Sequence, residues 1–321
     1  MPLMHVLLIF VDGLGIGTRG AHNPLSLLEP EAASPLAIFQ DEEPSLPHDG
    51  VLARTDACLG VEGRPQSASG QTTILTGTNA PAVLGYHKQG FPNEAMREII
   101  REHSIFLQLK QAGIAPNVFA NTYTERFFNA RPRWVSATTV AVEAAAMRFR
   151  TVEDLRAGRA VYHDFTNRLI IEAGAETSAA AQQGVALRTP EEAASVLASV
   201  SAAHRFTLYE YFITDRMGHL QDMDGALHVL AQLARFVRAV LDRVDLTQTT
   251  VMLTSDHGNI EDLSMRNHTL NFVPTLAWGQ ARAHVRRRVR TLADITPVIV
   301  EILTSQQQTT LEQLSMQEAT T

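Results

Sequence analysis

The amino-acid sequence predicts an α/β fold with a largely parallel sheet. Three short apolar segments, 6–11, 206–213 and 250–254, are rich in branched and aromatic residues, which is typical of buried strands. Between the second and the third, apolar residues recur at three- and four-residue spacing from Ala226 to Leu241, which predicts an amphipathic helix. A strand, a helix packed back on the sheet and a second strand form a βαβ unit, and this unit defines the fold class.

Each of the three predicted strands runs into an acidic residue. Asp12 follows the first strand, Asp215 the second and Asp256 the third. In open α/β sheets, ligands bind beyond the carboxyl ends of the strands. The sequence therefore places candidate functional residues at one edge of the sheet.

Composition and charge restrict the class of protein. The chain has 321 residues, 45% of them hydrophobic, which is enough for one large domain or for a core domain with an insertion. A net charge of -7 is typical of an acidic soluble protein and disfavours non-specific electrostatic binding of nucleic acid. We interpret the one dense basic run, 282–290, as a solvated face.

Cysteine content and hydropathy predict a cytoplasmic protein. Cys58 is the only cysteine, so no intrachain disulfide can form and no oxidising compartment is required. The apolar run 6–11 is too short to span a membrane and has no basic leader before it. We therefore expect no membrane partner.

The middle of the chain differs from the rest in amino-acid composition. Residues 86–203 contain Ala-rich helical stretches at 137–148 and 189–203, and none of the acidic strand ends. We expect a discontinuous metal-binding catalytic core of residues 1–85 and 204–305, with 86–203 inserted as a cap over the site. Residues 306–321 form a C-terminal tail to which we assign no function.

Two acidic motifs and one histidine are candidate metal ligands. In the motif 215–219, Asp215 and His219 are separated by three residues, so one helical turn can aim both at one cation, although such a pair alone is more often a surface pair. In the motif 256–259, the adjacent Asp256 and His257 can point to different metals. His268 becomes a candidate only in the company of these residues.

A serine-rich segment supplies a candidate nucleophile. Residues 67–77 are typical of a turn that leads into a short helix beginning near Ser67. A hydroxyl at a helix N-terminus faces unpaired N–H groups, which favour an anion there. The alternative is that Ser67 or Ser69 only caps the helix.

Taken together and in this order, these motifs closely resemble the alkaline phosphatase superfamily, in particular its branch of cofactor-independent phosphoglycerate mutase and phosphopentomutase. The resemblance covers about 1–80 and 205–280, and it is carried by 11–13, 215–219, 255–259 and 268–274. It implies an alkaline-phosphatase-like three-layer core with a largely parallel central sheet, plus a smaller inserted α/β cap.

The resemblance also implies a site with two divalent metal ions. One metal would be held by Asp215, His219 and His268, and the other by Asp12, Asp256, His257 and the Ser67 oxygen. Ser67, rather than Ser69, matches the family's nucleophile, because Gly70 then follows at the expected spacing. Mixed Asp and His ligands suit Mn²⁺ or Zn²⁺ better than Mg²⁺ or Ca²⁺, which prefer oxygen throughout.

The residues leave the activity open between three hypotheses. The first is a phosphohydrolase, either a phosphomonoesterase or a phosphodiesterase, that acts on a small phosphorylated substrate through a phosphoserine. The second is an intramolecular phosphomutase of the phosphoglycerate mutase or phosphopentomutase type. The third is a catalytically silent binding module. A sulfatase is disfavoured, because Cys58 lies outside the Pro- and Arg-containing motif of that branch.

Three arginines are candidates for substrate binding. Arg126, Arg131 and Arg133 are interleaved with aromatic residues and could bind a phosphate or carboxylate of the substrate. An ordinary protein surface explains them equally well.

Overall fold

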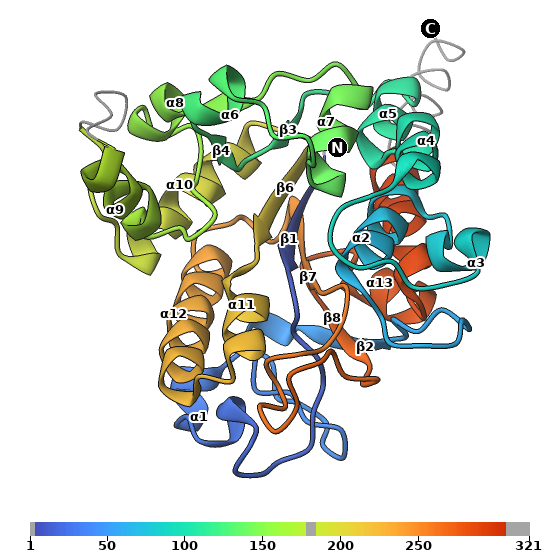
Figure 1. Cartoon of the computed structure of the whole chain (residues 1–321), viewed down its shortest axis with the longest axis vertical. Helices are drawn as coiled ribbons and strands as arrows, with labels where there is room; N and C mark the ends of the chain where they lie inside the picture. The colour runs from blue at the N-terminus through green and yellow to red at the C-terminus, as the bar shows by residue number, and fades with distance from the viewer. Residues whose placement is uncertain (1–3, 178–183, 306–321) are drawn as a thin grey trace, which may run out of the picture.

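A six-stranded sheet forms the centre of the computed structural model, which describes residues 4–177 and 184–305 (Figure 1). The strand order is β2-β8-β7-β1-β6-β3. β1 pairs in parallel with both β6 and β7, whereas β8 runs antiparallel to β7 and β2. The strands are β1 (His5–Val11), β2 (Val51–Thr55), β3 (Asn117–Phe119), β6 (Phe206–Tyr211), β7 (Thr249–Thr254) and β8 (Val273–Trp278).

Helices cover both faces of this sheet, which gives three layers (Figure 1). Alternate residues of β1 enter different cores: Leu7, Ile9 and Val11 on one face, and the intervening apolar residues on the other. This two-sided burial explains the continuous apolar run in the sequence. The first face carries α1 (Pro30–Ala33), α10 (Pro190–Ala202) and α12 (Met223–Leu241), and the second carries α2 (Ser67–Thr76), α4 (Glu94–His103), α5 (Ile105–Gln111), α7 (Ala137–Ala144) and α13 (Arg282–Arg288).

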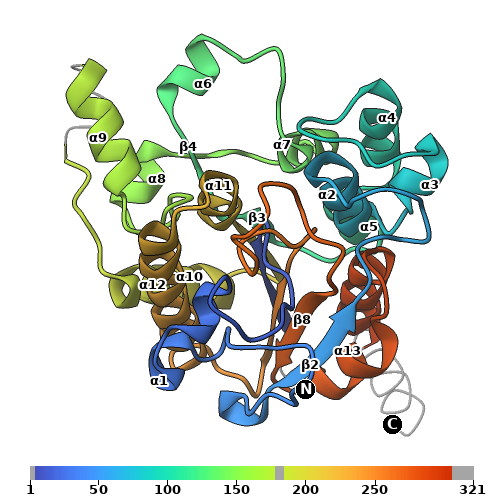
Figure 2. The ribbon, with the colours of Figure 1, turned by 60° about the horizontal axis from the view of Figure 1, so that its bottom comes forward.

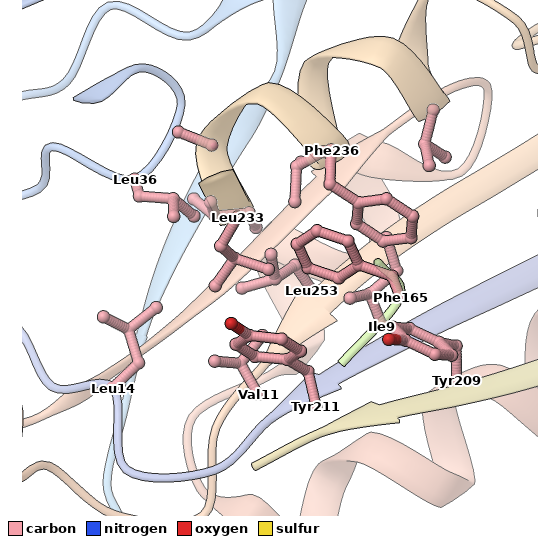
Figure 3. Packing of buried hydrophobic residues seen from close by; sticks show 14 of the residues in the cluster. Ile9, Val11, Leu14, Leu36, Phe165, Tyr209, Tyr211, Leu233, Phe236 and Leu253 are labelled. Carbon is pink, nitrogen blue, oxygen red and sulfur yellow. The ribbon is translucent and has the colours of Figure 1, made fainter. Parts of the chain in front are cut away.

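Stacked aromatic rings anchor a loop to the first face (Figure 3). Phe165 stacks on Phe236 of α12, with ring centroids 4.5 Å apart, and lies 5.2 Å from the ring of Tyr211. The Tyr209 hydroxyl donates a hydrogen bond to the carbonyl of Tyr162 at 3.0 Å. These contacts fix the loop 162–165 relative to the carboxyl end of β6.

Smaller elements lie around this core. β4 (Thr122–Tyr123) and β5 (Arg150–Thr151) form a separate two-stranded sheet. In Figure 2, α6 (Glu125–Asn129) and the chain that follows it arch above α2 and α11 (Ile213–Leu220). The remaining helices are α3 (Ala80–Leu84), α8 (Val152–Arg156) and α9 (Arg168–Thr177), with short 3-10 turns at Pro24–Ser26, Pro47–Asp49 and Leu292–Asp294.

The predicted inserted segment, 86–203, contributes to the three-layer core as well as to the small sheet. β3 pairs with β6 in the central sheet, and α10 packs against α12. Only parts such as β4, β5 and α6 lie outside the central sheet and its two helix layers. The division into a core of 1–85 and 204–305 and a cap of 86–203 stays a prediction, and the predicted tail of 306–321 lies outside the described residues.

Most predicted elements are present with bounds that differ by a few residues. The predicted strand 206–213 ends at Tyr211, because the chain turns at Phe212 into α11. The predicted helix 137–148 ends at Ala144, two residues before Ala146 adopts a positive φ of 53°. In α13, Val285 is buried while Arg286, Arg287 and Arg288 are exposed, consistent with a solvated basic face.

Among the described residues, every helix is too short or too polar to cross a membrane. The cytoplasmic location stays a prediction.

Close packing at Gly70 positions α2 against the loop after β7. A Cβ on Gly70 would lie 2.9 Å from both the Cβ and the carbonyl oxygen of Asp256. The helix can therefore approach this loop only because residue 70 is glycine.

We predict that Gly70→Ala displaces α2 and lowers the free energy of unfolding by on the order of 1 kcal/mol, because overpacking outweighs the better helix propensity of alanine. Urea denaturation measures this change. Gly20→Ala is the matched control, since a Cβ at Gly20 meets no atom within 4 Å. Equal stabilities of the two variants would contradict the prediction.

Candidate metal centre

All seven residues predicted for the site converge beyond the carboxyl ends of the three central strands. Asp12 directly follows β1, and Asp256 and His257 follow β7. The remaining four come from the elements next to these strands: Asp215 and His219 from α11, His268 from the loop between β7 and β8, and Ser67 from the start of α2. In Figure 2, α2 and α11 lie on either side of the loop that follows β7.

Asp215, His219 and His268 form the first cluster. The Nε2 atoms of the two histidines are 3.2 Å apart, and they lie 3.3 and 3.6 Å from the Asp215 carboxylate. Each Nδ1 faces a backbone carbonyl, that of Arg266 for His219 and that of Pro65 for His268. Because a carbonyl only accepts, each Nδ1 carries the proton, and in the neutral rings both Nε2 lone pairs point at a common position, as metal ligands require.

Asp12, Asp215 and His257 form a second cluster that shares Asp215 with the first. His257 Nε2 lies 3.3 Å from Asp12 Oδ1 and 3.6 Å from Asp256 Oδ2. The Ser67 Oγ is 2.9 Å from the same nitrogen. The predicted second ligand set, Asp12, Asp256, His257 and Ser67, is therefore assembled around one atom.

Burial disfavours the charged forms of these side chains and therefore shifts their pKa values. Burial, followed by the nearby Asp256 and Asp215, raises the pKa of Asp12 well above its usual value. Burial and Asp215 raise the pKa of Asp256 to about 8. Burial and the neighbouring His268 lower the pKa of His257, whose ring stacks on that of His268 with centroids 3.6 Å apart.

These groups fit divalent cations. Within residues 4–177 and 184–305, Asp12 Oδ1 is buried without a hydrogen-bond partner, and the ion pairs of Asp12, Asp215 and Asp256 are with histidines alone. Neutral imidazoles and crowded carboxylates without arginine or lysine are the donor set that a divalent metal stabilises.

The geometry favours Ser67 over Ser69 as the nucleophile. Ser69 is fully buried, and its hydroxyl donates to the Gln66 carbonyl and accepts from the Lys88 N–H. The Ser67 hydroxyl faces His257 and lines a pocket.

Polar residues that sequence reasoning missed hold the carboxylates in place. Gln71 Nε2 donates to Asp12 at 3.1 Å and to Asp256 at 3.2 Å. Asn259 Nδ2 donates to Asp215 Oδ1 at 2.7 Å. The spacing of four residues between Ser67 and Gln71 on one helix was a usable signal for Gln71, since residues at this spacing share a helix face.

Glu261 is a further residue that the sequence did not reveal. Its buried carboxylate accepts from the N–H groups of Gly15 and Asn259 at 3.0 and 2.7 Å, and from the side chains of Thr269 and Asn271. It therefore ties together the loops that follow β1 and β7. No sequence spacing identifies such a contact, because its partners lie far apart in the chain.

A pocket of about 650 Å³ opens beside the metal centre. Its lining includes Ser67, Asp12, Asp215 and Arg216. Arg131 and Arg133 line a separate hollow of about 350 Å³, and Arg126 is exposed on α6 and lines neither. The role of these three arginines in substrate binding stays a prediction, whereas Arg216, which sequence reasoning missed, is the guanidinium that lines the pocket beside Ser67.

We predict that metal binding strengthens as the pH rises from 6 to 9. The raised pKa of Asp256, about 8, means that the metal-free folded protein keeps a proton that the unfolded chain loses near pH 4. The metal-free protein therefore loses stability as the pH rises from about 4 to about 8, whereas a metal binds the ionised carboxylate.

Thermal unfolding with Mn²⁺ and with a chelator, at several pH values, measures this effect. The increase in Tm caused by Mn²⁺ should grow with pH, and it should grow less in Asp256→Asn. The same increase at pH 6 and pH 9 would contradict the prediction.

Comparison with known sequences places the chain in a family. The sequence profile of the Metalloenzyme superfamily matches residues 147–307, which is half of the chain. This match includes Asp215, His219, Asp256, His257 and His268.

Curated relatives match over a shorter region. The chain is 26% identical over 108 residues to the 2,3-bisphosphoglycerate-independent phosphoglycerate mutase of Gracilaria tenuistipitata var. liui, a match that covers 31% of this chain and 21% of the relative. The corresponding enzyme of Desulforudis audaxviator is 29% identical over 102 residues, which covers 30% of this chain and 20% of the relative. The chain thus matches about a fifth of the length of these relatives.

Solved structures share the fold across nearly the whole chain. The PH0037 protein from Pyrococcus horikoshii superposes with a TM-score of 0.52 and 17% identity, covering 94% of this chain and 98% of that one. A cold-active alkaline phosphatase from a psychrophilic Shewanella species also superposes with a TM-score of 0.52, at 11% identity, covering 94% of this chain and all of that one. The fold, the profile match and the mutase relatives together confirm the predicted resemblance: the chain belongs to the Metalloenzyme superfamily, and it is an alkaline phosphatase superfamily protein.

Proposed function

We propose that this protein is a two-metal-dependent phosphohydrolase that acts through a phosphoserine at Ser67. The observation that carries the proposal is the position of the Ser67 Oγ, which lies 2.9 Å from His257 Nε2 and belongs to a residue that lines the pocket. The serine thus contacts a candidate metal ligand and borders the space that a substrate would enter. The substrate would be a small phosphate ester.

The ligand sets suit Mn²⁺ or Zn²⁺, because they mix imidazoles with carboxylates. Asp215, His219 and His268 would hold one ion, and Asp12, Asp256, His257 and Ser67 the other. When bound, such ions lower the pKa of a hydroxyl and offset charge on the phosphoryl oxygens.

The chain's own residues then perform two displacements. In the first, the Ser67 oxygen forms a bond to phosphorus while the bond from phosphorus to the ester oxygen breaks, and the alcohol leaves with a proton. In the second, water attacks the phosphoserine, so that phosphate is released and Ser67 regains its proton. Gln71 and Asn259 keep the carboxylates in position throughout, since each donates to them.

Access of water favours hydrolysis over intramolecular transfer. Phe91 and Trp134 line the pocket and are 49% and 51% exposed, so the cavity is open to solvent. A mutase must instead exclude water while its substrate turns.

The alternative, a phosphomutase, is supported by the curated relatives. These proteins are phosphoglycerate mutases, and the chain matches about a fifth of their length. The third hypothesis, a silent binding module, is disfavoured because two groups of side chains that could hold a metal ion are assembled, Asp215 with His219 and His268, and Asp12 with Asp215 and His257.

A panel of metals and substrates on the purified protein tests the proposal. Mn²⁺ and Zn²⁺ are combined with phosphate monoesters and diesters, 3-phosphoglycerate and ribose phosphates. We expect release of free phosphate. Isomerisation without release would establish the mutase, and no turnover with any metal would support the silent module.

We predict that Ser67→Ala lowers kcat by at least about a thousandfold, because no phosphoserine can form. Metal binding, measured by calorimetry, should persist, since the other six predicted ligands remain. Ser69→Ala is the control: it should lose less than about tenfold in kcat, while its lost backbone hydrogen bonds lower stability by about 1–3 kcal/mol. Full activity in Ser67→Ala with loss in Ser69→Ala would show that the nucleophile is Ser69.

A further inference from the structure

Aromatic rings form the wall of the pocket beyond Ser67. They come from the segment after β3, from the loop 162–165 and from the end of β6. The rings that line it include Phe119, Tyr123, Phe127, Trp134, Tyr162 and Phe212. Phe212 and Trp134 are also among the exposed large apolar residues of the described chain. Exposed rings that face a cavity next to a reactive group mark a ligand site more often than a packing site.

The rings are held by one another rather than by a ligand. Tyr123 packs edge-on against Phe127 at 4.7 Å and against Phe149 at 4.5 Å, and its hydroxyl shares a 2.8 Å hydrogen bond with that of Thr139. On the other side, His163 lies between Tyr162 and Phe212, with centroids 3.8 and 4.6 Å away. Such a wall is preorganised, so a flat group can bind to it with little loss of side-chain entropy.

Three arginines contact rings of the wall but line a separate hollow rather than the pocket. Arg97 and Arg133 lie 5.9 and 5.0 Å from the centroid of the Trp134 ring, and Arg131 lies 5.8 Å from that of Phe127.

Burial lowers the pKa of His163 to about 4, so this ring is neutral at physiological pH. Among the described residues that line the pocket, Arg216 is the guanidinium, and it is adjacent in sequence to the ligand Asp215. Apart from Arg216, a carboxylate on the leaving group would therefore meet aromatic rings and the acidic side chain of Glu210 within the described lining of the pocket.

Glu210 supplies a polar contact on this wall. Its backbone is fixed by Asn121, whose side chain donates to the Glu210 carbonyl at 2.7 Å and accepts from its N–H at 2.9 Å. Glu210 is 9% exposed and lines the pocket. Burial raises the pKa of Glu210 to about 7, so the group can accept or donate a hydrogen bond with a hydroxyl or an amino group.

From the aromatic wall, the single guanidinium among the described residues that line the pocket and the position of Glu210, we propose that the substrate is a phosphate ester of an uncharged alcohol that contains an aromatic ring with hydroxyl or amino groups. A nucleoside monophosphate is the accessible example of this class. The phosphate would lie at Ser67, and the ring would lie between the aromatic side chains. This inference rests on the proposed hydrolase function and names its substrate class.

Steady-state kinetics on the metal-loaded protein test the substrate class. The probes are adenosine monophosphate, glycerol phosphate and 3-phosphoglycerate. We expect kcat/KM for adenosine monophosphate to exceed that for glycerol phosphate by at least about tenfold, because stacking of the adenine ring on the aromatic wall adds binding energy. The value for 3-phosphoglycerate should be the lowest. An equal or higher kcat/KM for glycerol phosphate or 3-phosphoglycerate would overturn the inference while leaving the hydrolase intact.

A pair of variants locates the ring. Trp134→Ala should reduce the preference for adenosine monophosphate over glycerol phosphate by at least about fivefold, because the ring loses a stacking partner. Tyr86→Ala is the matched control: Tyr86 is 48% exposed, close to the 51% of Trp134, but does not line the pocket, so its preference should equal that of the wild type. An unchanged preference in Trp134→Ala would overturn the placement.

Binding of adenosine alone separates this inference from the proposed function. The chain has two tryptophans, and Trp278 is fully buried, so quenching of the exposed Trp134 reports on the pocket. Quenching by adenosine, together with no hydrolysis of any ester, would refute the hydrolase and support the ligand class. The absence of quenching alongside hydrolysis of glycerol phosphate would refute the ligand class alone.

Discussion

Three carboxylates from neighbouring strands and the helix after β6 are brought together at one edge of the sheet, and the site depends on how their charge is balanced. Asp12 and Asp256 are buried, and Asp215 lies within reach of Asp12 and His257. Buried like charges cost several kcal/mol unless they are protonated or paired with a cation. Here the nearby partners are imidazoles and side-chain amides, which orient the carboxylates without neutralising them. Divalent metal ions resolve this conflict, and the site is organised for them.

The scaffold and the wall of the pocket have separate origins in the chain. The ligand clusters rest on β1, β6 and β7, which are the central strands and are buried on both faces. The aromatic wall comes mainly from the segment between β3 and α7. Under the proposed function, chemistry at phosphorus and recognition of the alcohol would therefore be supported by different structural elements. Such a separation lets one fold serve different reactions, because function depends on the site rather than on the fold.

Much of the centre could be predicted from the sequence, because its residues directly follow strands with a clear apolar pattern. The parallel order of those strands, together with the family resemblance, was enough to group the seven residues. The role of β3 in the sheet was not predictable, since three residues carry too little pattern to distinguish a strand from a loop. The role of Glu261 was not predictable for another reason. It joins two loops through tertiary contacts, and such contacts produce no recognisable spacing of residues in the sequence. For Arg131 and Arg133 the local pattern was visible, but the sequence could not show that they line a hollow separate from the pocket that contains Ser67, and their role in substrate binding stays a prediction.

The contacts of Glu261 also have a meaning for folding. One carboxylate joins Gly15, near one end of the described chain, to Asn259, Thr269 and Asn271, near the other. Contacts between residues so distant in sequence close large loops and form late, once the intervening chain has been ordered. The metal centre is thus completed only when almost the whole fold is in place. A partly folded chain would lack a competent site, so premature binding of metal ions to incompletely folded chains is disfavoured.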